Sequence, residues 1–124
     1  MPSAREDYLL RLIQQMASLA RRLRERLTGA SSDEATDVEK EAGDAIVELL
    51  GPQATLLRSL DARSAVQLAG GAERVAAWIA LLRVQAQARR ARGDDATAAR
   101  LDERAAALER EGRGHFGDDL PKVE

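Results

Sequence analysis

The 124-residue sequence contains no cysteine and only one residue each of phenylalanine, tyrosine and tryptophan. Without cysteine, the chain cannot form a disulfide scaffold or a thiolate zinc site. Aromatic and β-branched residues predominate in strands, and the chain also has only 6 valines and 3 isoleucines. It has no run of about 18 apolar residues, so we do not expect stable insertion into a membrane.

The residues that are abundant favour helices. The chain has 24 alanines, 17 leucines and 17 arginines, and all three residue types are good helix formers. Its hydrophobic share of 44% is too high for a disordered chain, and its length suits one domain. The composition therefore predicts a single all-α domain with a packed core. We expect Trp78, which has apolar neighbours at helical spacing, to belong to that core.

Two features of the sequence bear on its origin and location. Arginine outnumbers lysine 17 to 2, which is typical of a GC-rich bacterial genome. The chain carries Glu6 and Asp7 where a signal peptide requires basic residues followed by an apolar run. We therefore expect a bacterial protein that resides in the cytoplasm.

Capping patterns and apolar spacing locate the helices. Ser3 precedes Glu6 by three residues, and Ser31 precedes Glu34 by three, so both pairs match the capping-box pattern that begins a helix. Apolar residues at helical spacing predict four main helical segments and two short ones. The main segments cover residues 4–27, 32–50, 72–92 and 95–111, and the short ones cover residues 53–60 and 62–69.

Glycines are expected to end these helices. Gly29 and Gly93 suit the left-handed position that follows a helix, and Gly112 is expected to end the last one. We therefore expect a small helical bundle over residues 1–112. The remaining residues, 113–124, contain glycine, proline and charged residues, and we expect them to form a flexible tail.

The stretch over residues 80–110 pairs two helical segments around a tight turn. Small residues occur where the two segments approach each other, at Ala86, Ala98 and Ala105. This stretch resembles a single tetratricopeptide-type helix hairpin, and the resemblance implies such a hairpin at the C-terminal end. The repeat prefers leucine and aromatic residues at three positions that are occupied here by Gln85, Arg89 and Asp102. No second copy is visible, so we do not expect a groove of stacked repeats.

The opening stretch, residues 7–16, reads Asp-Tyr-Leu-Leu-Arg-Leu-Ile-Gln-Gln-Met. It is similar to the first helix of a family of uncharacterised, all-helical bacterial proteins. Members of that family tend to end in a tetratricopeptide-like hairpin. The resemblance implies the same order of elements in this chain, and it brings no known activity.

Acidic residues follow one face of the second predicted helix, because they are spaced by three and four residues. This acidic stripe comprises Glu34, Asp37, Glu41, Asp44 and Glu48. A di-metal carboxylate bundle also needs Glu-x-x-His pairs, and the single histidine, His115, lies in the tail. The sequence also has no Gly-rich phosphate loop and no serine in a nucleophile elbow. We therefore expect no enzymatic activity, no cofactor and no metal site.

Two basic clusters, at residues 21–26 and 89–92, each precede a turn into an acidic helix. The whole chain has a net charge of -2, whereas a nucleic-acid-binding domain is usually basic. We therefore expect the clusters to pair with acids of the same chain, and we expect no nucleic-acid partner.

The first predicted helix carries apolar residues in two adjacent stripes. The first stripe comprises Leu9, Leu12, Met16, Leu19 and Leu23, and the second stripe comprises Leu10, Ile13, Ala17, Ala20 and Leu27. A helix that covers one side of a small bundle needs a single stripe. The wider apolar face predicts contact with another copy or a partner protein, with the first stripe at the interface. The other interpretation is that the helix lies at the centre of its own bundle.

We therefore expect a non-enzymatic interaction or scaffold domain that forms a homodimer through its first helix, or that binds an unidentified protein partner. A two-fold, antiparallel pairing would bring Glu6 and Asp7 of one copy near Arg22 and Arg26 of the other. The alternative is a helical bundle that binds a small molecule beside Trp78, or a metal ion at the acidic stripe.

Overall fold

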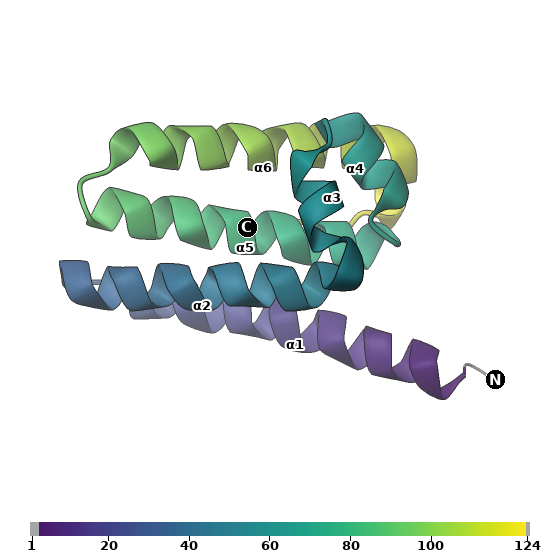
Figure 1. Cartoon of the computed structure of the whole chain (residues 1–124), viewed down its shortest axis with the longest axis horizontal. Coiled ribbons are helices and arrows are strands. Elements are labelled where there is room, and N and C mark those ends of the chain that lie inside the picture. The colour runs from purple at the N-terminus through teal and green to yellow at the C-terminus, as the bar shows by residue number, and fades with distance from the viewer. Residues whose placement is uncertain (1–2, 124) are drawn as a thin grey trace.

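The computed structural model describes residues 3–123, and over these residues it contains helices and no strand (Figure 1). The all-α prediction is confirmed. The four long helices are α1 (Ala4–Arg26), α2 (Ser32–Leu50), α5 (Ala72–Ala91) and α6 (Asp95–Phe116). The short helices are α3 (Ala54–Ser59) and α4 (Ala62–Leu68), and 3-10 turns cover Gly51–Gln53 and Gly117–Asp119.

Side-chain caps fix the starts of the helices where the sequence predicts them. At α1 the capping box is complete, because the Glu6 backbone N–H donates to the Ser3 hydroxyl and the Ser3 backbone N–H donates to the Glu6 carboxylate. At α2 only the first half forms, with the Glu34 N–H donating to Ser31 over 3.2 Å. Each cap satisfies a backbone donor that has no partner inside the helix.

The two predicted glycine turns are confirmed. Gly29, between α1 and α2, has a φ of 69°, and Gly93, between α5 and α6, has a φ of 84°. Only glycine adopts this left-handed conformation without a steric penalty. Asp94 follows as the cap of α6, and its carboxylate accepts a hydrogen bond from the Thr97 N–H over 3.1 Å.

Helix α5 is the centre of the bundle. It contacts α1, α2 and α6, and Figure 1 shows α6 on one side of it and the α1–α2 pair on the other. Of its 20 residues, 11 are buried, and they point in all directions around the helix. Trp78, which is 1% exposed, is the largest of the fully buried side chains, so its predicted place in the core is confirmed.

The predicted end of the last helix at Gly112 is wrong. Helix α6 continues to Phe116, and Gly112 is buried inside it. A Cβ at this position would lie 3.2 Å from Leu120 Cδ2 and 3.6 Å from Val75 Cγ1, so the glycine gives the Leu120 side chain room to pack closely against α6. Leu120 is 3% exposed, and the Arg83 guanidinium donates to the Val123 carbonyl over 3.2 Å. Part of the predicted tail therefore packs against the core.

The N-terminal turns of α1 extend beyond the end of α2 (Figure 1). No described residue before Leu12 is buried. Tyr8 and Leu10 are 61% and 51% exposed, which leaves large apolar side chains on this end of the helix.

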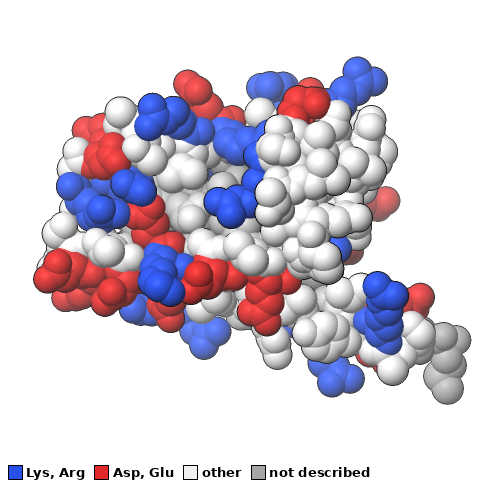
Figure 2. Space-filling model, viewed as in Figure 1, with Lys and Arg blue, Asp and Glu red and all other residues white. Residues whose placement is uncertain are grey.

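Most of the predicted charge pairing is confirmed for the second basic cluster. Arg89 contacts Glu39 over 2.6 Å and Asp94 over 3.0 Å, and Arg92 shares the same Glu39 carboxylate. In the same cluster, Arg90 pairs with an acid of α6. Figure 2 shows acidic side chains gathered along α2, with basic side chains next to them. These pairs are partly exposed, and each contributes only about 0 to 1 kcal/mol.

Candidate functional site

Most of the first stripe of α1 is used by the protein's own core. Leu12, Met16 and Leu23 are 7%, 8% and 0% exposed. Leu19 is partly buried and packs against the core, and Leu9 is half-buried. Helix α1 buries this stripe because it packs on α5 as well as on α2. The five predicted interface residues are therefore mostly covered within one copy of the chain.

The second stripe of α1 has a different environment. Ile13, Ala17 and Ala20 line a groove of about 270 Å³ between α1 and α5. Leu10, which lies one turn earlier on the same side of the helix, is 51% exposed. The apolar stripe therefore continues from the groove onto the projecting end of α1.

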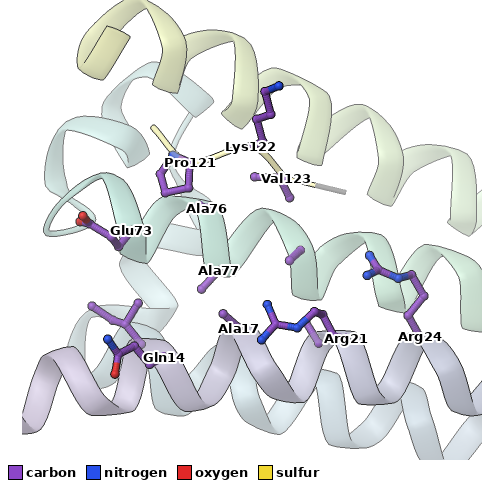
Figure 3. Close-up of a pocket in the computed structure, with 13 residues that line it drawn as sticks. Gln14, Ala17, Arg21, Arg24, Glu73, Ala76, Ala77, Pro121, Lys122 and Val123 are labelled. Atoms are coloured by element: carbon purple, nitrogen blue, oxygen red, sulfur yellow. The ribbon is translucent and has the colours of Figure 1, made fainter. Parts of the chain in front are cut away.

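Helix α5 provides the opposite wall of the groove with three alanines, Ala76, Ala77 and Ala80. Figure 3 shows Ala17 of α1 and Ala77 of α5 pointing toward each other across it. Because alanine has a single methyl group, these positions leave a hollow between the two helices instead of filling it.

The third wall comes from the C-terminal segment. Pro121, Lys122 and Val123 line the groove, and in Figure 3 they lie beside α5, on the side away from α1. The hydrogen bond from Arg83 to the Val123 carbonyl ties this segment to α5. Leu120 anchors it in the core just before the groove.

Charged side chains stand at the rim of the groove. Arg21 and Arg24 project from α1 at one end, and Glu73 of α5 and Gln14 of α1 lie at the other end (Figure 3). Arg21 donates a hydrogen bond to the neutral Ser18 hydroxyl over 3.2 Å. Together with Lys122, these residues give the rim more positive than negative charge.

The sequence did not predict that α5 and the C-terminal segment would contribute to this site. Residues of α1 and α5 that face each other are more than 50 positions apart along the chain. One signal for the α5 wall was available. Ala76, Ala77 and Ala80 are small residues at helical spacing on a helix whose other apolar residues are mostly large.

The acidic stripe of α2 does not form a metal site in the described part of the chain. Within residues 3–123 no group of three or more His, Asp or Glu side chains is arranged to hold a metal ion. Glu41 pairs with Arg26 of α1, and Asp44 accepts a hydrogen bond from Lys40 over 2.9 Å. The single histidine, His115, is exposed and packs edge-on against Phe116.

No helix among the described residues is long and apolar enough to cross a membrane. Comparisons of this chain with protein-family models, with curated proteins and with solved structures find no match. The function therefore has to be inferred from the geometry of the chain itself.

Proposed function

We propose that this chain is a non-enzymatic protein-interaction domain that forms a homodimer through the second stripe of α1. The observation that carries the proposal is the exposure of Leu10, which lies one helical turn before Ile13 of the apolar groove. An unpartnered leucine beside an alanine-lined hollow is a typical arrangement for helix-in-groove recognition.

The order of charges along the second stripe supports a second copy as the occupant. Glu6 and Asp7 lie four and three residues before Leu10, so all three share one side of α1. At the other end of the stripe, Arg21 follows Ala17 by four residues. The stripe is therefore acidic at its start, apolar in the middle and basic at its end.

When two copies of this stripe lie antiparallel, the acidic start of each faces the basic end of the other. Two antiparallel α1 helices about a two-fold axis would bring Leu10 of each copy over Ala17 of the other. The same register would place Glu6 and Asp7 of each copy beside the basic end of the other stripe. This register differs from the sequence-based one, because Arg26 already pairs with Glu41 of its own chain.

The finer description of the α5–α6 hairpin as tetratricopeptide-like is also a proposal. It is supported by the complete burial of Ala86, Ala98 and Ala105, each 0% exposed, at the positions where that repeat has small residues. We likewise propose that the protein is bacterial, which the arginine-rich composition supports, and that it resides in the cytoplasm.

The dimer is tested by multi-angle light scattering of the purified chain at micromolar concentrations. We expect about twice the mass of the 13.5 kDa chain. The variant Leu10→Glu should shift the protein to the monomer mass, because it puts a carboxylate at the apolar centre of the interface. Leu56→Glu is the matched control, since Leu56 is 50% exposed but lies on α3, outside the groove.

A monomer mass for the unmodified chain over the micromolar range would contradict the dimer. Equal masses for the two variants would show that any dimer forms through another surface. If the chain is a monomer but binds a different protein, and Leu10→Glu abolishes that binding, the groove is assigned to an unidentified protein partner instead.

A further inference from the structure

A second, smaller pocket lies on the other side of α5, away from α1. Its volume is about 140 Å³, and it is lined by residues of α2, α3, α5 and α6. A cavity of about 10–15 Å³ is enough for one water molecule, so this pocket has room for a small ion. Its lining comprises Gly43, Ile46, Arg58, Trp78, Leu82, Gln85, Leu101 and Arg104.

The polar groups of this lining are rich in hydrogen-bond donors. Arg58 and Arg104 bring two guanidinium groups, Gln85 brings an amide, and no acidic side chain is among the lining residues. An arginine keeps its positive charge at neutral pH even when it is partly buried. The pocket therefore presents positive charge without a carboxylate of its own.

Arg104 is held in place by neutral groups. Its guanidinium donates to the Leu57 carbonyl over 3.1 Å and lies over the Trp78 ring, 5.5 Å from the ring centroid. Asp61, the cap of α4, acts on Arg104 only electrostatically, without an ion pair between them in the described chain. Burial lowers the pKa of Arg104 below its ordinary value, as expected for a cation with little compensation.

Trp78 is among the residues that line the pocket. The residue is 1% exposed, and its Nε1–H finds no acceptor among the described residues. The surrounding protein atoms cover this nitrogen, so a ligand in the pocket would lie beside Trp78 without contacting its N–H.

Gly43 keeps the α2 side of the pocket open. It lies in the middle of α2, where glycine is unfavourable compared with alanine. A Cβ at this position would lie 3.2 Å from Gln85 Nε2, so a larger residue would press on a side chain of the pocket.

We propose that this pocket binds a small oxyanion, a carboxylate or inorganic phosphate, whose oxygens accept hydrogen bonds from Arg58 and Arg104 next to Trp78. Guanidinium groups recognise both ions through the same charge-assisted hydrogen bonds. The site is separate from the α1 groove, and neither proposal depends on the other.

The test uses the fluorescence of the full chain, because Trp78 is its single tryptophan. Sodium phosphate and sodium acetate are titrated separately, with sodium chloride added to keep the ionic strength constant. We expect a saturable change in emission with one or both of these ions. A saturable titration with phosphate or with acetate shows which of the two oxyanions the pocket binds.

Arg104→Met should weaken binding at least tenfold. Arg110→Met is the matched control, because Arg110 is exposed on the same helix, lies outside the pocket and should leave binding unchanged. If Arg104→Met does not fold, Arg58→Met tests the same pocket through an exposed residue, and it should also weaken binding. An emission change that does not saturate, or that the pocket variants leave unaltered, would overturn the proposal.

Discussion

The α1–α2 and α5–α6 hairpins are joined in the same way but packed differently. Each has a glycine with positive φ in its turn, Gly29 or Gly93. Helices α5 and α6 contact each other much more extensively than α1 and α2 do. The buried residues of α6 are mostly small (Ala98, Ala105 and Gly112), whereas those of α1 are mostly large (Leu12, Met16 and Leu23).

This difference shows that sequence neighbours in a helical chain are not necessarily the main packing partners. Helix α1 packs more on α5 than on α2, although α2 follows it directly. Small residues allow close approach where two helices meet along their length, and α5–α6 has them in its interior. In α1 the small residue Ala17 lines the groove and is only partly buried.

The largest expected difference in the free energy of unfolding is between a substitution at the centre of the α5–α6 hairpin and one at the projecting end of α1. Trp78→Ala should lower the free energy of unfolding by about 3–5 kcal/mol, because it empties a fully buried site. Tyr8→Ala, at a residue that is 61% exposed, should change it by less than about 0.5 kcal/mol. Urea unfolding followed by circular dichroism measures both. Similar losses in the two variants would contradict the assignment of α5 as the centre.

Replacing an alanine with leucine compares the packing inside the α5–α6 hairpin with the packing at the groove between α1 and α5. Ala105→Leu should destabilise the chain by about 1–3 kcal/mol, because Ala105 is 0% exposed and has no space around it. Ala17→Leu should change stability by less than about 0.5 kcal/mol, since Ala17 borders a hollow. The unfolding midpoints of the two variants in urea give the comparison. A large loss for Ala17→Leu would mean that the groove is closed in solution.

The turn of the α5–α6 hairpin depends on the backbone of Gly93. Gly93→Ala should cost about 1–2 kcal/mol through its φ of 84° alone, because nothing lies within 4 Å of a Cβ there. Gly114→Ala, also in open space but in the helical backbone of α6, should stabilise by about 0.5 kcal/mol. Thermal unfolding should therefore shift in opposite directions. A stabilised Gly93→Ala variant would place the turn elsewhere.

The smallest expected effect concerns the caps after the two turns. A hydrogen bond from the Thr97 backbone N–H holds the pKa of Asp94 below its ordinary value of 3.8. Since the folded-state pKa is the lower one, the stabilisation is complete above about pH 4 and is lost as the pH falls through the folded value. Ser31, which caps α2, does not titrate.

Asp94→Ser should therefore flatten the acid side of the stability profile between about pH 5 and pH 2. Melting temperatures of the variant and the unmodified chain, measured by circular dichroism across that range, give the comparison. All other acids are common to both proteins, so their titration cancels. Identical acid slopes would show that the Asp94 cap contributes nothing in solution.

Local signals in the sequence predicted the helices well. The starts at Ser3 and Ser31 and the turns at Gly29 and Gly93 depend on a few neighbouring residues, and all are confirmed. These features follow from hydrogen bonds and backbone angles that short stretches determine by themselves.

Contacts between distant segments could not be predicted in the same way. Gly112 has the pattern of a helix end, and only its approach to Leu120 and Val75 explains why the helix continues through it. The two stripes of α1 were visible, but which one the core would bury depended on the position of α5. The predicted interface stripe is therefore mostly buried, and the groove lies along the other stripe.

The five alanines that line the groove between α1 and α5 have a thermodynamic consequence. An alanine has no rotamers to lose, whereas a long side chain loses up to about 2 kcal/mol of conformational free energy when it is immobilised. When a partner docks against these alanines, they lose almost no side-chain conformational entropy. The entropy cost of ordering therefore comes mainly from the side chains of the partner. Association through the groove should then show the negative heat-capacity change of apolar burial, with little ordering of the receiving protein beneath it.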